Sequence, residues 1–572
     1  MKRKTLTTAI IAGLTGVAGM VGVANAVNVN PDGLGQVLIY PYYTARGGND
    51  TLISVVNTSS QAKSTKVRFL EGLNSREVLD FNLYLSAFDV WTAAITVEDD
   101  GAKLLTADTS CTVPYIFGSG GEQRLLDFEF TGENEDGATT DEERVRSGYI
   151  EIIETGTVFG DTREFGLDQF GDQVLLGFSD ENIDPTGAVV STFGSEYALT
   201  HVDKFDEDGN FVTREPRDCG QLVQAWTTTN FGAISPLFYW SRDRFVDHVP
   251  SGGGSLFGSA SIINVEEGTM FSYNSVPIDN WTADVEHTAP GLTTPTIVSG
   301  SVETSAVFRS AGQDVDQQTW DSNAEAVNAV LMNEKVLNEY AINPALGGLT
   351  EWVFTFPTKR FHVDPLAGLP QVPLLDDGGD PVEDDDGDIV LTDEAIPPFS
   401  VVFDGESCEP VDFRFWDREE LQPGPQFGLI PPIVSPAPPV PDTEISTFDL
   451  CFEANIIRFA ASDAAVPDQT EILGERRFTT FPLESRWRAG WAEFDFSPEL
   501  IPAALDFPDT ARIQENAAGT AQYVGLPVVG FSVNTFSNGA LETDAGVVQS
   551  NYGGSFVHRG SRRIELTEST VD

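Results

Sequence analysis

The chain has 572 residues and is strongly acidic, with 88 Asp and Glu against 33 Lys and Arg and a formal net charge of -55 at pH 7. Such a surface repels nucleic acids and anionic lipids and attracts cations, so nucleic-acid binding is excluded. Hydrophobic residues make up 41% of the chain, including 38 Phe and 9 Trp, which excludes a disordered acidic polymer and predicts a folded protein.

The first 26 residues have the three parts of a secretory signal peptide. Positions 2 to 4 are basic, an apolar stretch runs from Ala9 to Val23, and Ala24-Asn25-Ala26 supplies the small residues of a cleavage site. We therefore expect a mature protein that begins at Val27 and is periplasmic, surface-exposed or secreted. No later stretch of ~20 apolar residues occurs, so we expect no transmembrane segment in the mature chain.

Alternation of apolar and polar residues predicts an all-β protein. Leu79 to Leu85, Trp352 to Phe356 and Ala492 to Phe496 place apolar side chains at every second position, the period of a strand with one buried face. Asp208-Gly209 and Glu267-Gly268 lie between such runs and predict two β-hairpins. Many short strands separated by turn residues are typical of sandwiches. We predict two or more antiparallel β-sandwich domains.

One segment has the sequence of a helix. Ser322 and Glu325 form a capping box, and good helix formers with apolar residues at helical spacing run from Ala324 to Ala341. Pro344 and Gly347-Gly348 then end the pattern. We predict one long helix near residues 322–341, of about five turns at 3.6 residues each, which packs across the end of a sandwich.

These patterns divide the chain into four parts: a signal peptide at 1–26, an N-terminal β-sandwich region at 27–320, a helical insertion at 321–345 and a C-terminal β-sandwich region at 346–572. The last part contains an acidic loop at 376–388. It also contains a proline-rich excursion at 410–441, whose composition favours extended polyproline structure.

Four cysteines occur, an even number in a chain expected to reach an oxidising compartment. Three connectivities are possible for four cysteines. We predict the sequential one, Cys111 with Cys219 and Cys408 with Cys451. Because no CxxC pair is present, neither a zinc site nor a redox motif is expected.

The common enzyme motifs are absent from this sequence. Its 5 His are scattered without HExxH, and there is no GxSxG, Walker loop or GxGxxG. A catalytic triad assembled from distant positions stays open. We predict no catalytic and no cofactor-binding residue, and we favour a protein that is not an enzyme.

The abundant carboxylates admit two interpretations. Calcium binds carboxylate and carbonyl oxygens in Gly-containing loops, and the candidate ligands are Asp203, Asp206 and Asp208 in one loop and Asp384, Asp386 and Asp388 in another. Neither loop follows the EF-hand order, and a solvated acidic loop is the simpler alternative for both. The second interpretation is carbohydrate chemistry, which uses a carboxylate pair with aromatic platforms. The candidate platforms are Trp226, Trp240, Trp281, Trp487 and Trp491.

Four segments of the sequence resemble those of known proteins. They are NPDGLGQVLIYPYYT at 30–44, LISVVNT at 52–58, NSREVLDFN at 74–82 and FTFPTK at 354–359. Together they resemble an uncharacterised family of secreted or cell-surface proteins of Gram-negative bacteria, over most of the mature chain. The resemblance implies a location outside the cytoplasm and brings no activity or site residues.

We therefore expect an exported, acidic, non-enzymatic surface or extracellular-matrix-type protein with a structural or binding role, for which calcium is a candidate stabilising ion. Its expected partners are cations, further copies of itself or a surface polysaccharide. The alternative is a secreted carbohydrate-binding or glycoside-hydrolysing protein that uses exposed Trp and a carboxylate pair. Trp clustered beside two carboxylates in a cleft would favour the alternative, whereas Trp dispersed into cores would favour the first hypothesis.

Overall fold

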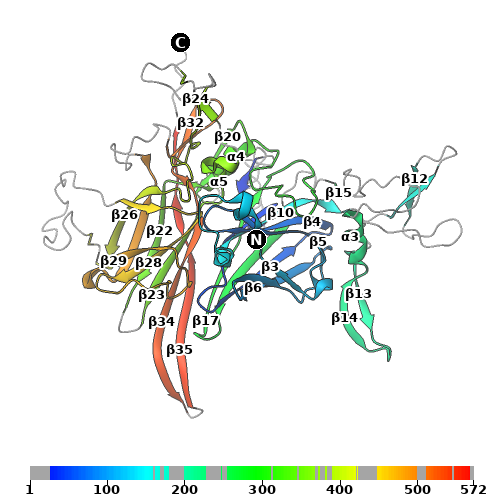
Figure 1. The fold of residues 1–572 in the computed structure, drawn as a ribbon, viewed down its shortest axis with the longest axis horizontal. Coiled ribbons are helices and arrows are strands. Elements are labelled where there is room, and N and C mark those ends of the chain that lie inside the picture. Colours follow the sequence, from blue (N-terminus) through cyan, green and yellow to red (C-terminus); the bar gives the residue numbers. More distant parts are fainter. Residues whose placement is uncertain are drawn as a thin grey trace, which may run out of the picture.

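Two β-sandwiches that pack side by side make up most of the computed structural model of this protein (Figure 1). The predicted signal peptide, except Ala26, and the second predicted calcium loop, with Asp384, Asp386 and Asp388, lie outside the described residues. No helix in the described ranges is long and apolar enough to cross a membrane. These ranges are 26–158, 162–167, 173–179, 199–226, 246–247, 254–310, 314–343, 347–367, 371–373, 381–382, 389–419, 421–422, 447–498, 511–543 and 546–566.

The N-terminal sandwich consists of two antiparallel sheets around one core. Sheet 1 has the spatial order β1 (Asn28–Val29), β18 (Val276–Asp279), β2 (Val37–Thr44), β10 (Ser147–Val158), β4 (Ala62–Glu71), β5 (Glu77–Leu85) and β8 (Cys111–Val113), with β15 (Val246–Asp247) also paired to β10. Sheet 2 has the order β17 (Thr269–Asn274), β16 (Leu256–Asn264), β3 (Asn49–Asn57), β6 (Val90–Glu98), β7 (Gly101–Leu105) and β9 (Glu122–Arg124). Phe69, Phe81 and Trp91 are among the side chains that fill the space between them.

Both faces of sheet 1 are covered, which corrects the expectation of a half-buried strand over Leu79 to Leu85. The strand β5 exists, but its polar face is buried as well. A segment that follows β18 lies over this face: His287 hydrogen-bonds Tyr84 at 2.8 Å, and Asn82 donates to the Thr288 carbonyl at 2.8 Å. The polar residues of the alternating pattern therefore serve a buried polar layer and do not face solvent.

The C-terminal sandwich also has two sheets, with an aromatic core. Sheet 3 has the order β27 (Thr447–Leu450), β26 (Glu409–Asp417), β30 (Ala489–Asp495), β22 (Lys335–Ala341) and β36 (Arg559–Ser561). Sheet 4 has the order β29 (Phe478–Leu483), β28 (Ala454–Ala461), β23 (Leu349–Thr355), β34 (Val529–Thr543) and β35 (Gly546–Val557). Trp352, Phe354, Phe413 and Phe494 are buried between these sheets, so the predicted strands near Trp352 and Ala492 are confirmed. Their second faces are largely buried as well, which corrects the expectation of one buried face.

The two sandwiches share a hydrophobic core. Sheet 4 turns one face toward sheet 3, while Val353, Ile456 and Phe531 on its other face join the core of the N-terminal sandwich. The Thr355 hydroxyl also donates to the Pro41 carbonyl at 2.5 Å. Because apolar side chains of both halves bury one another, the sandwiches form one structural body.

The predicted long helix is wrong in its extent. The capping box is confirmed, because the Ser322 side chain accepts from the Glu325 amide and α4 (Asn323–Leu331) follows. The chain then forms β21 (Met332–Asn333) and β22, whose Val336 and Tyr340 enter the aromatic core. A spacing of four residues puts two side chains on the same face of a helix or of a strand. Because residues 335–341 pair with β30, this segment is a strand and not a helix.

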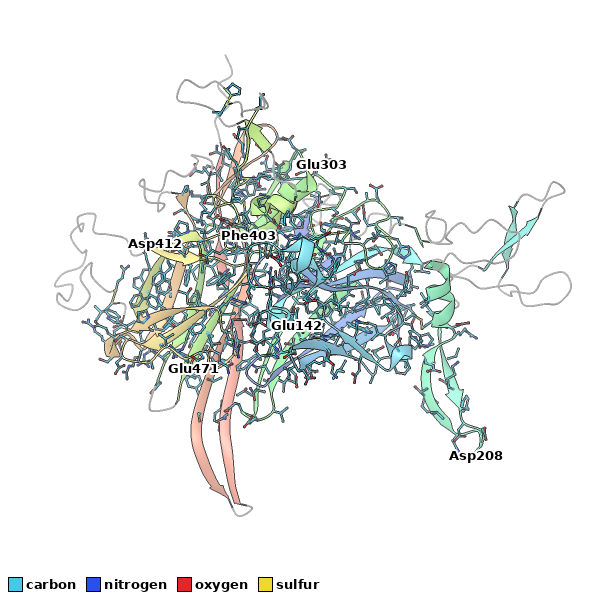
Figure 2. The ribbon with its side chains drawn as sticks, in the orientation of Figure 1. Glu142, Asp208, Glu303, Phe403, Asp412 and Glu471 are labelled. Carbon is cyan, nitrogen blue, oxygen red and sulfur yellow. A yellow bond between two sulfur atoms is a disulfide. The ribbon has the colours of Figure 1, made fainter. Side chains whose placement is uncertain are left out.

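Both predicted hairpins are present, as β13 (His201–Phe205) with β14 (Phe211–Pro216) and as β16 with β17. Figure 2 shows Asp208 at the tip of the first hairpin, which projects from the body of the protein. The remaining elements are β11 (Thr162–Leu167), β12 (Gln173–Ser179), α3 (Cys219–Trp226), β19 (Thr304–Ser310), β20 (Asp314–Thr319), α5 (Arg360–Val363), β24 (Gln371–Pro373), β25 (Leu391–Asp393), β31 (Ile513–Glu515), β32 (Ala521–Val524), β33 (Leu526–Pro527) and β37 (Arg563–Leu566).

Candidate functional site

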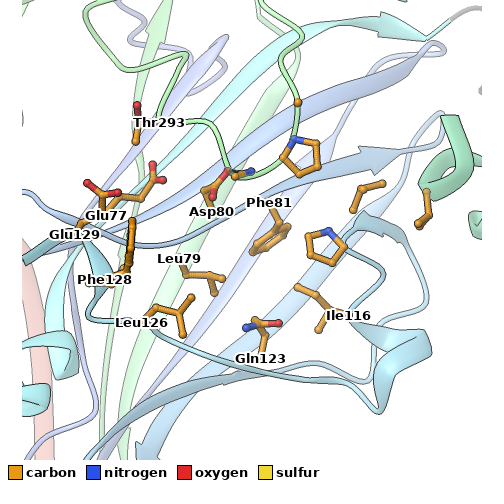
Figure 3. A pocket seen from close by; sticks show the side chains of 17 residues that line it. Glu77, Leu79, Asp80, Phe81, Ile116, Gln123, Leu126, Phe128, Glu129 and Thr293 are labelled. Atoms are coloured by element: carbon orange, nitrogen blue, oxygen red, sulfur yellow. Dashed lines mark hydrogen bonds between the residues drawn. The ribbon is translucent and has the colours of Figure 1, made fainter. Parts of the chain in front are cut away.

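A cleft lies beside the first half of β5. The short strand β8 pairs only with Asn82–Tyr84, so among the described strands none covers this edge of β5 from Glu77 to Phe81. The cleft has a volume of about 780 Å³ and lies between the segments 113–129 and 289–293 (Figure 3). This volume is in the range of roughly 300–1,000 Å³ that small-molecule sites occupy.

The interior of the cleft is mostly apolar, and part of its rim is apolar as well. Phe81 and Ile116 are buried side chains of the lining, whereas Leu126 is 50% and Phe128 67% exposed. The rim is held in place, because the Leu126 amide donates to the Val78 carbonyl at 2.7 Å. Large exposed apolar side chains at the mouth of an apolar cleft are typical of a binding surface.

Three carboxylates line the cleft, with Glu77 and Glu129 together at one end and Asp80 between them and Phe81 (Figure 3). Glu77 accepts a hydrogen bond from the Arg68 guanidinium at 2.7 Å, and burial raises the pKa of Glu77. Asp80 forms an ion pair with Lys66 and accepts from the Gly291 amide at 3.0 Å. Glu129 is half-buried and has no hydrogen-bond or ion-pair partner among the described residues. It is therefore the carboxylate that is free to meet a cationic ligand.

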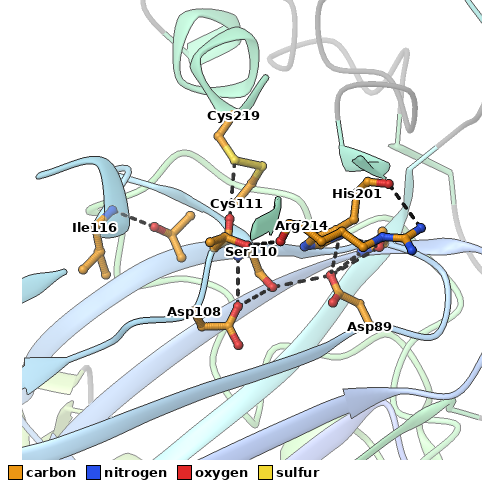
Figure 4. Close-up of a disulfide and its surroundings, with 11 residues drawn as sticks. Asp89, Asp108, Ser110, Cys111, Ile116, His201, Arg214 and Cys219 are labelled. Atoms are coloured by element: carbon orange, nitrogen blue, oxygen red, sulfur yellow. Dashed lines mark hydrogen bonds and ion pairs between the residues drawn. A yellow bond between two sulfur atoms is a disulfide. The ribbon is translucent and has the colours of Figure 1, made fainter. Parts of the chain in front are cut away.

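A disulfide fixes one wall of the cleft. Cys111 of β8 is bonded to Cys219 of α3, as predicted (Figure 4), and Val223, one helical turn further along α3, lines the cleft. The adjoining hairpin is attached nearby, since the His201 ring lies 3.3 Å from the Ser86 hydroxyl. The disulfide therefore links the position of α3 to the edge of sheet 1 that forms the cleft.

The first predicted calcium loop forms the turn of the β13–β14 hairpin. The Asp206 carboxylate accepts from the amides of Asp208 at 3.0 Å and Asn210 at 2.8 Å, and these hydrogen bonds lower the pKa of Asp206. Asp203 lies on β13 and is 3.9 Å from the Arg214 guanidinium. These contacts account for Asp206 as a turn residue, and calcium binding by the loop stays a prediction.

The second predicted disulfide, Cys408 with Cys451, is also present. Glu406 lies beside it, and among the described residues these three form a group with the composition of a metal site. Both sulfur atoms are bonded to each other and are not available as thiolate ligands. This group is therefore a structural cross-link.

The predicted Trp platforms have different environments. Trp281 is fully buried and donates to the Ile297 carbonyl at 2.6 Å, and Trp487 is buried against Phe415. Trp240 and the side chain of Trp226 lie outside the described residues. Trp491 alone of the described candidates is exposed, at 38%. It stacks on Trp416, which we did not single out, although β26 places Trp416 on the same face as Asp412 and Arg414.

The buried carboxylates belong to ion pairs or hydrogen-bond networks. Arg144 lies between Glu71 and Asp136, at 2.8 Å and 2.6 Å, and lowers the pKa of both carboxyls against the effect of their burial. Burial raises the pKa of Glu351 to about 7 and that of Glu453 to about 8, but neither residue lines the cleft. A glycosidase places its carboxyl pair and aromatic platforms around the sugar, and no Trp is among the described residues that line this cleft.

No family model, curated protein or solved structure matches this chain. The chemistry of the cleft is therefore inferred from its own residues. The resemblance to secreted or surface proteins of Gram-negative bacteria stays a prediction.

Proposed function

We propose that this protein is an exported, non-enzymatic binding protein and that the cleft beside β5 is its ligand site. The observation that carries the proposal is one cleft that combines an apolar interior, the exposed ring of Phe128 and the unpaired carboxylate of Glu129. Apolar walls supply affinity, while a few polar groups fix the orientation of a ligand.

The ligand class follows from the same residues. An apolar body fits the walls formed by Phe81, Ile116 and Phe128, and a cationic group pairs with Glu129. The net charge of -55 attracts cations to this surface and repels anions such as fatty acids. We therefore propose small amphiphilic amines as the ligands.

Export is supported by two observations. The first 26 residues carry the pattern of a signal peptide, with basic, apolar and small-residue parts. Both disulfides also fit an oxidising compartment, since cytosolic thiols are kept reduced.

The test is calorimetric titration with 4-phenylbutylamine and 4-phenylbutyrate, which share an apolar body and differ in the sign of their charge. We expect the amine to bind more tightly than the acid. Phe128→Ala should weaken binding of the amine about tenfold, equivalent to ~1.4 kcal/mol, and Glu129→Gln should reduce the preference for the amine. Phe257→Ala is the matched control, because this exposed ring lies outside the cleft. Equal binding of the two probes, or unchanged affinity in Phe128→Ala, would contradict the proposal.

A further inference from the structure

Two Trp side chains form a stacked pair on the outer face of sheet 3. Trp416 of β26 and Trp491 of β30 lie opposite each other in the strand register, and their ring centroids are 4.0 Å apart with 8° between the planes. Their neighbours Phe415 and Ala492 point to the other face, into the aromatic core. The indole of Trp491 is 38% exposed. Trp416 is half-buried beneath this neighbour, and an exposed indole supported by a second ring is typical of recognition surfaces.

Charged side chains continue this face along the strands. Arg414 lies opposite Glu493, and its guanidinium is 2.9 Å from Asp412 and 3.8 Å from Glu493. Lys335 of β22 is 3.3 Å from Glu493, which extends the network across the sheet. The Arg414 side chain is nevertheless 39% exposed. The network therefore holds hydrogen-bonding groups in fixed positions beside the indoles.

Glu339 completes the surface on the other side of the pair. It lies opposite Trp491 on β22, and its side chain is exposed. We define the Trp416–Trp491 face as Trp416, Trp491, Glu339, Arg414 and Glu493, of which Glu493 is largely buried. The face belongs to the C-terminal sandwich and shares no residue with the cleft beside β5.

We propose that the Trp416–Trp491 face binds a neutral oligosaccharide. The C–H face of a pyranose ring packs on an indole, and its hydroxyls form hydrogen bonds with guanidinium and carboxylate groups. Because the two indoles hold each other in place, a ligand immobilises few rotatable bonds when it binds. The ligand is neutral, since the net charge of -55 repels acidic glycans.

The spacing along the strands gives the direction of the glycan. The Arg414–Glu493 row lies two residues from the Trp416–Trp491 row, which is about 6.6–6.8 Å at a rise of 3.3–3.4 Å per residue. This distance is somewhat longer than one pyranose unit of an extended glycan, and the hydroxyls of the next unit can span the difference. One unit therefore stacks on the indoles while the next meets the charged row, so the glycan runs along β30.

The proposal is tested by calorimetric titration of the mature protein with cellohexaose, laminarihexaose, maltohexaose and N-acetylated chitohexaose. We expect at least one of them to bind. Trp491→Ala should weaken that binding at least about tenfold, and Arg414→Gln should weaken it severalfold, while both variants bind 4-phenylbutylamine as the unmodified protein does. Tyr552→Ala is the control, because its ring is 57% exposed on a different sheet.

Two further measurements test the proposal even if Trp491→Ala does not fold. In the unmodified protein, a bound hexaose should protect exposed Trp from oxidation by N-bromosuccinimide, and Trp491→Phe should retain part of the affinity. Failure of all four glycans to bind at millimolar concentration would overturn the proposal. Unchanged affinity in a folded Trp491→Ala protein would also overturn it. A loss of self-association in Trp491→Ala, with no glycan bound by either protein, would assign the face to contact between copies of the chain instead.

Discussion

Tyr273 of the N-terminal sandwich stacks on Phe531 of the C-terminal sandwich, with ring centroids 4.5 Å apart and 20° between the ring planes. The Tyr273 hydroxyl also donates to the Tyr42 carbonyl. The side chain therefore contacts the C-terminal sandwich through its ring and the N-terminal sandwich through its hydroxyl. This contact lies within the core that both sandwiches share. Residues more than 250 positions apart in the chain therefore stabilise each other directly.

The shared core predicts that the two sandwiches unfold together. Phe531→Ala removes a ring that is 1% exposed and should lower the free energy of unfolding by ~3–5 kcal/mol. Calorimetry should show one unfolding transition for the two sandwiches of the unmodified protein. In the variant, this single transition should occur at a lower temperature. Two separate transitions, with only one of them shifted by the substitution, would show that the sandwiches are independent.

The buried carboxyl of Glu453 predicts a pH dependence of stability. Burial raises the pKa of Glu453 from 4.5 to about 8, so the folded state keeps a proton that the unfolded state has released. The stability from this group is complete below about pH 4.5 and is lost as the pH rises through about 8. Glu453→Gln cannot ionise, and should gain up to ~1.4 kcal/mol per pH unit relative to the unmodified protein over this window.

Urea unfolding midpoints at about pH 5, 6, 7 and 8 test the Glu453 prediction. The nearby Lys359 has a pKa lowered to about 8 by burial, so it contributes a slope of opposite sign only above that pH. The control is Glu515→Gln, because the Glu515 side chain is exposed. A constant difference in stability between Glu453→Gln and the unmodified protein would contradict the assignment.

The Cys111–Cys219 disulfide should affect both stability and ligand binding. The bond joins residues 108 positions apart, and its replacement by two Ser should cost ~2–5 kcal/mol. Because α3 then loses its attachment to β8, the wall with Val223 is no longer fixed and the affinity for 4-phenylbutylamine should fall. Replacement of Cys408 and Cys451 by Ser is the matched control, which should lower stability and leave that affinity unchanged. Equal affinities for 4-phenylbutylamine in the two double variants would show that the Cys111–Cys219 disulfide does not affect ligand binding.

Much of the fold could be predicted from local patterns. The Asp208-Gly209 and Glu267-Gly268 turns gave both hairpins, and the alternation around Phe354 and Phe494 gave strands of the aromatic core. The helix failed beyond Leu331 because Val336 and Tyr340 satisfy either period. Only the pairing of β22 with β30, about 150 residues further along the chain, distinguishes the two states.

The candidate site could not be predicted in the same way. Its lining comes from β5, from 113–129, from α3 and from 289–293, which are brought together only by the tertiary fold. The local sequence around Phe128 and Glu129 carries no periodic pattern that distinguishes a rim from an ordinary loop. The half-buried Trp416 could have been singled out from the sequence, since the alternation along β26 assigns it to the charged face with Arg414.

Calcium binding by the loop with Asp203, Asp206 and Asp208 is tested by thermal melts in sodium and calcium chloride of matched ionic strength. Screening acts on all carboxylates, whereas a bound ion adds stability that saturates at low concentration. We expect calcium to raise the melting temperature above the matched sodium control, and chelator to reverse the effect. Asp206→Asn preserves an acceptor for the turn amides and should abolish the calcium-specific increase. A melting temperature that follows ionic strength alone would leave Asp206 as a turn residue only.

We propose that the cleft beside β5 holds an amphiphilic amine. The most direct measurement is the anomalous diffraction of crystals soaked with 4-(4-bromophenyl)butylamine. We predict a bromine peak among Phe81, Ile116 and Phe128, with the amine next to the Glu129 carboxylate. A crystal with the cleft accessible to solvent and no bromine peak in it, or with the only peaks elsewhere, would contradict the claim.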